Sequence, residues 1–115
     1  MPQQFVSILT LSLALTGIVA PSRFVTPAGA QAGADANALG VARTGGISGD
    51  LVPVDVLGTS LVEAGAAVSA GDTVKADASG RAVTWATSGA RIGIALGDAS
   101  AAGDLIEVLL IPNAA

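Results

Sequence analysis

The chain has 115 residues, contains neither cysteine nor histidine, and carries five basic and nine acidic residues for a net charge of −4. These features exclude disulfides, a Ser-His-Asp or Cys-His catalytic centre and the usual zinc sites. Scattered cations argue against nucleic acid as a partner, because the phosphate backbone is bound by clustered Lys and Arg. Only 12% of the residues are charged and 3% are aromatic. The core of this single small domain must therefore be aliphatic, and we expect oligomerisation to add stability.

The stretch Phe5 to Ala20 reads FVSILTLSLALTGIVA and contains no charged side chain. Leucine occupies every odd position from Leu9 to Leu15, and this period of two predicts an extended strand with one apolar face. A membrane helix fits poorly, since it needs about 20 mainly apolar residues, so we expect no membrane partner. A cleaved signal peptide is the alternative, because Ala28-Gly29-Ala30 resembles a cleavage site, although no charged side chain precedes the apolar run.

Two short strands are expected next, over residues 22–26 and 37–43, with a loop over residues 28–38 between them. The loop consists of Ala, Gly, Gln, Asp and Asn, which are too small and polar to fill a core. In the second strand, alternation places Leu39 and Val41 on one face.

A turn of small residues that ends in Gly-Asp recurs before three apolar strands, at Gly49-Asp50, Gly71-Asp72 and Gly103-Asp104. Gly permits positive φ and Asp can bond to nearby backbone, so each turn predicts a sharp reversal. Pro53 follows the first turn and lacks a backbone donor, which places its strand at a sheet edge or a bulge. The strand after the third turn, Leu105 to Ile111, is apolar on both faces except at Glu107. We expect it in the middle of a barrel or sandwich, or beneath a neighbouring subunit.

A hairpin is predicted around residues 77–80, followed by a strand over residues 81–87, a turn at Ser88-Gly89 and a strand over residues 91–96. In the last strand we assign Ile92, Ile94 and Leu96 to the core face. Gly93 and Ala95 then leave the other face flat enough for another backbone to approach. Short strands separated by turn signals about every 8 to 12 residues predict an all-β fold. We expect a small β-barrel or β-sandwich with an extended N-terminal arm and little or no helix.

The sequence predicts no catalytic residue, metal site or cofactor. Two carboxylate pairs, Asp50 with Asp55 and Asp72 with Asp77, could in principle do acid–base work. One member of each pair belongs to a turn, however, and the other to a solvent-facing position or the next turn. A calcium loop starting at Asp35 fails, because a leucine and a glycine occupy ligand positions. We therefore expect that the protein is not an enzyme.

Three stretches carry a resemblance to a known family: MPQQFVSILTLSL at the start, RFVTPAGAQAGADANALGVART from Arg23, and GRAVTWATSGARIGIALGDASAAGDLIEVLLI near the end. In this order they resemble the capsid decoration proteins of tailed phages, also called cement or head-stabilising proteins. The resemblance covers nearly the whole chain. It implies a non-enzymatic virion protein that forms homotrimers on the outer surface of the head and stabilises contacts between major capsid protein subunits. It also implies that the N-terminal segment is retained and helps bind the shell.

The resemblance divides the chain into a capsid-engaging arm, residues 1–20, and a β-rich decoration domain, residues 21–115. An extended, uncharged arm can add to a sheet edge without the desolvation cost of buried charges. The predicted capsid-binding residues are Pro2, Phe5, Val6, Ile8, Leu9, Leu11 and Leu13. The predicted trimer contacts are Gly93, Ala95, Leu105, Glu107 and Leu109, with a place in the chain's own core as the alternative for each. The alternative function is a secreted or periplasmic β-domain that binds a ligand or a cell-surface component after losing about 30 residues.

Overall fold

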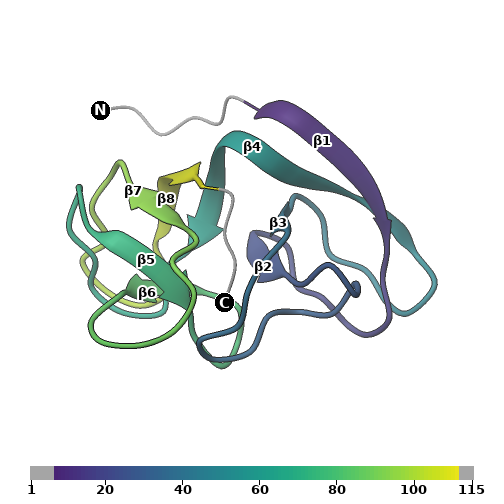
Figure 1. Cartoon of the computed structure of the whole chain (residues 1–115), viewed down its shortest axis with the longest axis horizontal. Coiled ribbons are helices and arrows are strands. Elements are labelled where there is room, and N and C mark those ends of the chain that lie inside the picture. Colours follow the sequence, from purple (N-terminus) through teal and green to yellow (C-terminus); the bar gives the residue numbers. More distant parts are fainter. Residues whose placement is uncertain (1–6, 112–115) are drawn as a thin grey trace.

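The computed structural model describes residues 7–111, which form eight β-strands and no helix (Figure 1). The strands are β1 (Ser7–Ala14), β2 (Arg23–Val25), β3 (Gly40–Ala42), β4 (Leu51–Glu63), β5 (Thr73–Ala76), β6 (Ala82–Thr84), β7 (Gly93–Ala95) and β8 (Leu105–Leu110). Within these residues there is accordingly no helix that could cross a bilayer. The predicted all-β class is confirmed.

The eight strands belong to one sheet that curves back on itself. Its order is β2-β3-β4-β8-β7-β5-β6, and β1 pairs with β4 outside this path. The curve is almost closed by a parallel bridge between Ala64, at the end of β4, and Ala82, at the start of β6. The Gly65 N–H also donates to the Ala82 carbonyl over 2.8 Å. The sequence left open whether the fold is a barrel or a sandwich, and the structure shows a nearly closed barrel.

The longest strand, β4, runs through both halves of the molecule (Figure 1). Its first half pairs with β1 on one side and with β3 on the other, and its second half pairs with β8. The two halves meet at Gly58, whose φ of 97° lies in a region that other residues rarely adopt. The register between β1 and β4 shifts beside this glycine, as in a β-bulge. Glycine and bulge together let β4 bend from one half into the other.

Pro53 lies in β4, which is the most extensively paired strand, so the prediction that its strand lies at a sheet edge is wrong. The Pro53 carbonyl accepts the Arg43 N–H over 3.1 Å, just beyond the end of β3. Because the N–H and C=O of a strand residue point to the same side, the missing donor falls where the β3 ladder ends. Proline is tolerated there without losing a ladder bond.

The two halves share one pattern of strand pairing. We call residues 9–57 the N region and residues 58–111 the C region. The β3–β4 pairs Val41–Asp55 and Ala42–Val54 recur as the β7–β8 pairs Ile94–Leu109 and Ala95–Val108. The β1–β4 pairs from Thr10–Asp55 to Ala14–Leu51 recur as the β4–β8 pairs from Thr59–Leu109 to Glu63–Leu105. The N region is therefore repeated, strand for strand, in the C region.

The connections between the strands repeat as well. The bridge Val19–Gly46 recurs as Val68–Ala99. The bonds from Leu15 N–H to the Asp50 carbonyl and from Ala32 N–H to the Phe24 carbonyl recur as Ala64 to Asp104 and Trp85 to Thr73. Position by position, residues 10–25 match 59–74, residues 31–43 match 84–96, and residues 49–57 match 103–111. The sequence retains traces of this repeat in LGVA at residues 39–42 and IGIA at residues 92–95.

Each region has its own cluster of buried side chains. The N-region cluster comprises Leu15, Val19, Val25, Ala42, Val52 and Val54, with Leu13, Leu39 and Val56 partly buried against it. The C-region cluster comprises Val62, Ala64, Val68, Val74, Ala76, Ala82, Ile92, Ala95, Ala99, Ile106, Val108 and Leu110, and it is joined by Phe24, Ala32, Ala38 and Val41 from the N region. The N region thus covers one side of the C-region core. The expectation that the loop over residues 28–38 cannot fill a core is therefore wrong, because Ala32 and Ala38 are buried.

The three Gly-Asp turns form as predicted. Gly49, Gly71 and Gly103 have φ values of 93°, 93° and 98°. Each following aspartate accepts a backbone N–H at the start of its turn: Asp50 from Ile47, Asp72 from Ser69 and Asp104 from Ser100, over 2.9 to 3.1 Å. Positive φ and a carboxylate acceptor together fix the reversal before each strand.

Candidate binding surfaces

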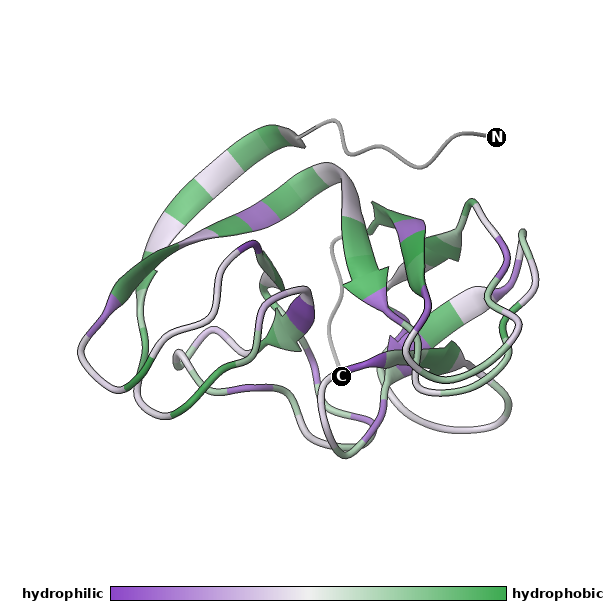
Figure 2. Cartoon of the chain, turned by 180° about the vertical axis from the view of Figure 1, so that it is seen from behind, coloured by the Kyte–Doolittle hydropathy of each residue, from purple (hydrophilic) through white to green (hydrophobic). Residues whose placement is uncertain are grey.

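β1 is the strand predicted from the leucine alternation, and hydrophobic and polar bands alternate along it (Figure 2). Leu9 and Leu11 are 42% and 41% exposed, and Leu13 packs on the N-region core. Ile8, where the register shifts, is 77% exposed. Because β1 pairs along its length with β4 of the same chain, these residues form a strand of the sheet and not a free arm. Of the other predicted capsid-binding residues, Pro2, Phe5 and Val6 lie outside the described residues.

An apolar groove runs beside β1. It has a volume of about 370 Å³ and is lined by Leu9, Leu11, Pro27, Ala38, Leu39, Val56 and Leu57. Every one of these side chains is hydrophobic. Such a groove offers contact area and no polar side chain to fix the orientation of a small ligand, which favours a protein surface as its occupant.

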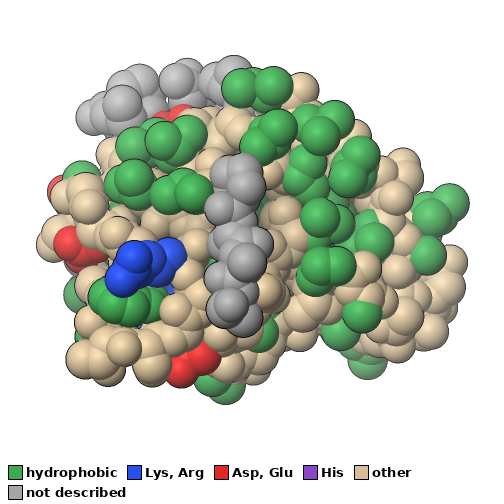
Figure 3. Space-filling view, in the orientation of Figure 1, with side chains coloured by type: hydrophobic (Ala, Val, Ile, Leu, Met, Phe, Trp, Pro, Cys, Tyr) green, Lys and Arg blue, Asp and Glu red, His purple; other side chains and the backbone are tan. Residues whose placement is uncertain are grey.

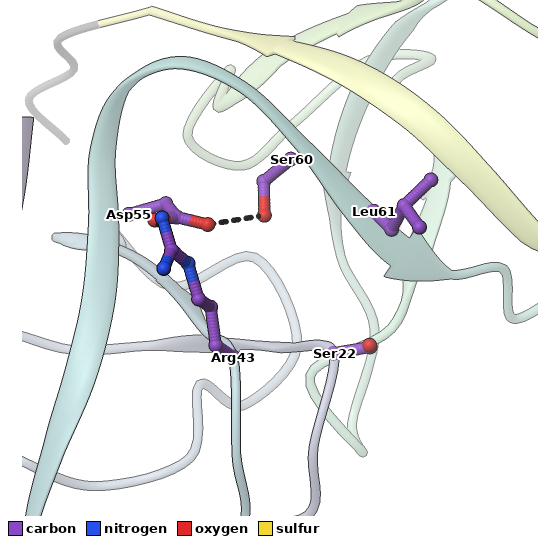
Figure 4. A pocket seen from close by; sticks show the side chains of 5 residues that line it. All are labelled: Ser22, Arg43, Asp55, Ser60 and Leu61. Atoms are coloured by element: carbon purple, nitrogen blue, oxygen red, sulfur yellow. Dashed lines mark hydrogen bonds and ion pairs between the residues drawn. The ribbon is translucent and has the colours of Figure 1, made fainter. Parts of the chain in front are cut away.

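A buried carboxylate ties β1 to the neighbouring strands, and Figure 4 shows its bond to Ser60 with the Arg43 side chain beside it. Asp55 is fully buried, and its Oδ1 accepts hydrogen bonds from Arg43 Nε at 2.9 Å and Thr10 Oγ1 at 3.0 Å. Its Oδ2 accepts from Ser60 Oγ at 2.9 Å. The Arg43 guanidinium lies beside a hollow of about 220 Å³ that Ser22 and Leu61 also line. These contacts satisfy the buried charge, and they join β1, β3 and both halves of β4.

Asp55 was predicted from the sequence to face solvent or lie in a turn, and this is wrong. The prediction failed because its partners Thr10 and Arg43 are distant in the sequence and lie in β1 and just after β3. In this cluster the Arg43 guanidinium and the Thr10 and Ser60 hydroxyls all donate to the carboxylate. Its chemistry is therefore that of a structural ion pair.

Three exposed isoleucine and leucine side chains lie at the end of the molecule beyond β1: Ile18, Ile47 and Leu51, with exposures of 81%, 60% and 71%. The bridge between Val19 and Gly46 brings the segments that carry them together. We call these three residues the apolar tip. Hydrophobic side chains gather on this side of the surface, around β1 and the first half of β4 (Figure 3). The tip was not predicted from the sequence, although an isoleucine between the glycines of a turn was the available signal.

The predicted trimer contacts lie on two different sides of the sheet. Ala95 is fully buried in the C-region core, and a side chain at Gly93 would overlap Val108 and the Leu109 carbonyl of β8. The assignment of Ile94 and Leu96 to the core face is therefore wrong, since these two residues are half-buried on the outside. The interior of a small barrel has little room, so small residues face inward here.

The outer face of β8 retains the other three predicted trimer contacts. Leu105 and Leu109 are 41% and 39% exposed, whereas Glu107 between them is only 3% exposed. Among the described residues, Oε1 of Glu107 has no hydrogen-bond partner. β8 lies between β4 and β7, which confirms its predicted position in the middle of the barrel. Its outer face combines apolar side chains with one unused acceptor.

A tryptophan and an arginine stack on the surface of the C region. The Arg91 guanidinium carbon lies 4.1 Å from the centre of the Trp85 ring, and the indole N–H donates to the Gly89 carbonyl over 2.9 Å. The nearby ion pair of Lys75 with Asp35, at 2.7 Å, also holds this loop. The Lys75 ammonium and the Ser88 hydroxyl lower the pKa of the Asp35 carboxyl below its ordinary value.

Asp77 and Asp104 accept hydrogen bonds within turns. Asp77 accepts the backbone N–H groups of Ser79 and Arg81 over 2.8 and 2.9 Å, as a turn residue does. The backbone and hydroxyl donors of Ser100 lower the pKa of Asp104. Between residues 7 and 111 no three acidic side chains come together in a way that could hold a metal ion.

Comparison with known protein families matches residues 3–110 to phage cement protein. The chain belongs to the phage cement protein family. The head fiber gp8.5 N base of bacteriophage phi29 is a similar solved structure, with a TM-score of 0.71 and 20% identity over 90% of this chain and 93% of that chain. At that identity the likeness shows the fold alone. Comparison with curated proteins gives no significant match. Family membership confirms the predicted resemblance, and a phage cement protein is a structural component of the virion.

Proposed function

We propose that this cement protein decorates the outer surface of the phage head as a homotrimer, binds the major capsid protein and stabilises contacts between neighbouring capsid subunits. The observation that carries the proposal is the family match over residues 3–110. The described residues form no metal-binding cluster and no catalytic arrangement, which supports a role in binding and not in catalysis. The protein would act without a cofactor.

The shell contact is proposed at the two ends of β1. Five of the nine exposed large hydrophobic side chains of the described residues belong to the N region, and a sixth, Ile8, directly precedes it; such a concentration favours an interaction site. Ile8 lies at one end of β1 and the apolar tip at the other, roughly 20 Å away for six strand residues. Two separate contact points suit a subunit that must hold two capsid subunits together.

Trimer formation would strengthen this binding. Three copies that bind in parallel convert modest single contacts into high avidity. On the outer face of β8, Leu105 and Leu109 offer apolar area, and Glu107 Oε1 offers an acceptor to a donor on a neighbouring chain. We leave Gly93 and Ala95 out of this proposed contact, because both are buried in the core.

The alternative of a secreted domain with a cleaved N-terminus is disfavoured by the packing. Cleavage after Ala30 would remove β1 and β2, and with them Leu15, Val19 and Phe24, which are buried in the two cores. The loss of several fully buried side chains costs about 2 to 5 kcal/mol each. We therefore propose that the N-terminal segment is retained in the working protein.

Co-sedimentation with heads that lack the decoration protein tests the proposal. Ile8→Asp and Ile18→Asp should each weaken binding about 10-fold or more, because a carboxylate must be desolvated in an apolar contact. Ala102→Asp adds the same charge at an exposed turn of the C region and should bind as the wild type does. Failure of the wild-type protein to bind such heads would contradict the proposed function. Unchanged binding of both isoleucine variants would contradict the proposed contact.

A further inference from the structure

Three matching positions of the repeat differ in burial between the two regions. In the C region, Val62, Ile92 and Leu110 are 0%, 1% and 7% exposed. Their N-region counterparts, Leu13, Leu39 and Val56, are only partly buried. The residue types are similarly apolar in both regions. The difference must therefore come from what covers them.

The N region itself provides the cover for the C region. Phe24, Ala32, Ala38 and Val41 join the C-region cluster and are 0% to 6% exposed. Main-chain bonds hold this contact, from Phe24 N–H to the Gly80 carbonyl at 2.8 Å and from Glu63 N–H to the Ser22 carbonyl at 3.0 Å.

No segment between residues 7 and 111 does the same for the N region. The corresponding side of the N-region core is the apolar groove, and Leu39 and Val56 are among the residues that line it. The groove is thus the N-region equivalent of the surface that, in the C region, is buried beneath Phe24, Ala32, Ala38 and Val41.

The repeat also identifies the surface that matches the cover. The counterparts of Phe24, Ala32, Ala38 and Val41 are Thr73, Trp85, Arg91 and Ile94. All four lie at the surface of the C region, where Arg91 is exposed and the other three are half-buried. We call them the Trp85 face. Trp and Arg are the residues most enriched at energetically dominant interface positions, and the stacked pair here is already ordered before any contact forms.

We propose that the Trp85 face of one copy packs into the apolar groove of a second copy. The contact would repeat, between chains, the packing of the N region on the C region within the chain. The contact is head-to-tail, because each copy contributes its Trp85 face to one neighbour and its groove to the other. Such contacts close into a ring when the rotation from one copy to the next permits it. The proposal deepens the proposed function by naming the surfaces of the trimer, and it rests on that function only for the number of copies. Ile94 pairs with Leu109, so the Trp85 face continues the outer face of β8 that is proposed above for the same trimer. The contact itself needs no shell.

Sedimentation of purified variants tests the two surfaces separately. Leu11→Asp places a charge in the groove, and Ile94→Asp places one on the Trp85 face. Each should weaken self-association about 30-fold or more, the loss expected for a central interface residue. Ser12→Asp is the matched control, because it lies next to Leu11 on the opposite face of β1 and is exposed. It should associate as the wild type does. Cooperative thermal unfolding of each variant confirms that it is folded.

Mixing the two defective variants gives the sharper test. Leu11→Asp retains an intact Trp85 face and Ile94→Asp retains an intact groove, so an equimolar mixture should form a pair that grows no further. Trp85 is the only tryptophan and the chain has no tyrosine. Its fluorescence should therefore shift to shorter wavelength on mixing, as the ring enters the groove.

Either of two results would overturn the proposal: a Leu11→Asp protein that associates like the wild type, or two folded variants that stay monomeric when mixed. A monomeric wild-type protein at its highest soluble concentration would overturn it as well. None of these measurements uses phage heads. A protein that self-associates as described and does not bind heads would contradict the proposed function alone. One that binds heads as a monomer would contradict this inference and the proposed homotrimer, and would leave the proposed head binding intact.

Discussion

The N and C regions share their main-chain contacts but differ in chemistry at one paired position. Asp55 of the N region corresponds to Leu109, and Arg43 corresponds to Leu96. The N region thus has a buried ion pair with hydroxyl donors where the C region has two leucines on its outer face. The C-region core is covered and needs no such cluster. The comparison indicates that a region left open on its apolar side is held in shape by directional polar contacts.

The largest effect is expected from breaking the ion pair on one side only. Arg43→Leu leaves the fully buried Asp55 without its cation, and this should lower the free energy of unfolding by about 3 kcal/mol. Chemical denaturation followed by Trp85 fluorescence measures the change.

The double variant Arg43→Leu with Asp55→Leu is the control, since it gives the N region the residues of the C region. It should recover much of the lost stability, because hydrophobic residues can replace a buried pair at little cost. A double variant less stable than Arg43→Leu would show that the repeat does not extend to side-chain packing at this position.

A smaller effect is expected where the two regions are most alike. Gly40 and Gly93 occupy matching positions, and a Cβ at either would overlap a carbonyl oxygen of the next strand, that of Asp55 or Leu109. Gly40→Ala and Gly93→Ala should each destabilise the protein by about 1 to 3 kcal/mol. Gly97→Ala is the control, because nothing lies within 4 Å of its added carbon. Equal melting temperatures for Gly93→Ala and Gly97→Ala would contradict the inward packing of β7.

The smallest effect concerns the turn that precedes β8. Hydrogen bonds from Ser100 lower the pKa of Asp104 below its ordinary value of 3.8. The carboxylate therefore contributes stability above pH 3.8, and this contribution is lost as the pH falls through the lower folded-state pKa. Asp104→Asn should melt below the wild type near neutral pH and approach it in acid. A difference in melting temperature that stays constant with pH would contradict this assignment.

The turns and β1 could be predicted from the sequence because their causes are local. Positive φ at Gly49, Gly71 and Gly103 depends only on glycine and the aspartate that follows it. The strand character of β1 follows from the leucine alternation between Leu9 and Leu15. Both signals lie within a few residues of the structure that they specify.

The faces of β7 and the burial of Asp55 could not be predicted, because they depend on distant partners. IGIA is apolar on both faces, so alternation alone does not say which face points into the barrel. Asp55 resembles a surface residue until Thr10 and Arg43, 45 and 12 residues away, are placed beside it. The groove and the apolar tip are also products of tertiary structure. Both consist mainly of leucine and isoleucine residues, and the sequence alone does not distinguish such residues at a surface from those in a core.

The bend of β4 at Gly58 has a mechanical consequence. One unbroken strand crosses from the N region, where the shell contact is proposed, into the barrel of the C region. A pull along either half of β4 is carried by hydrogen bonds that lie across the strand direction. Several of these bonds then bear the load together, and the force reaches both regions through covalent backbone. A swelling head would therefore strain this subunit as a single body and would not separate its two halves.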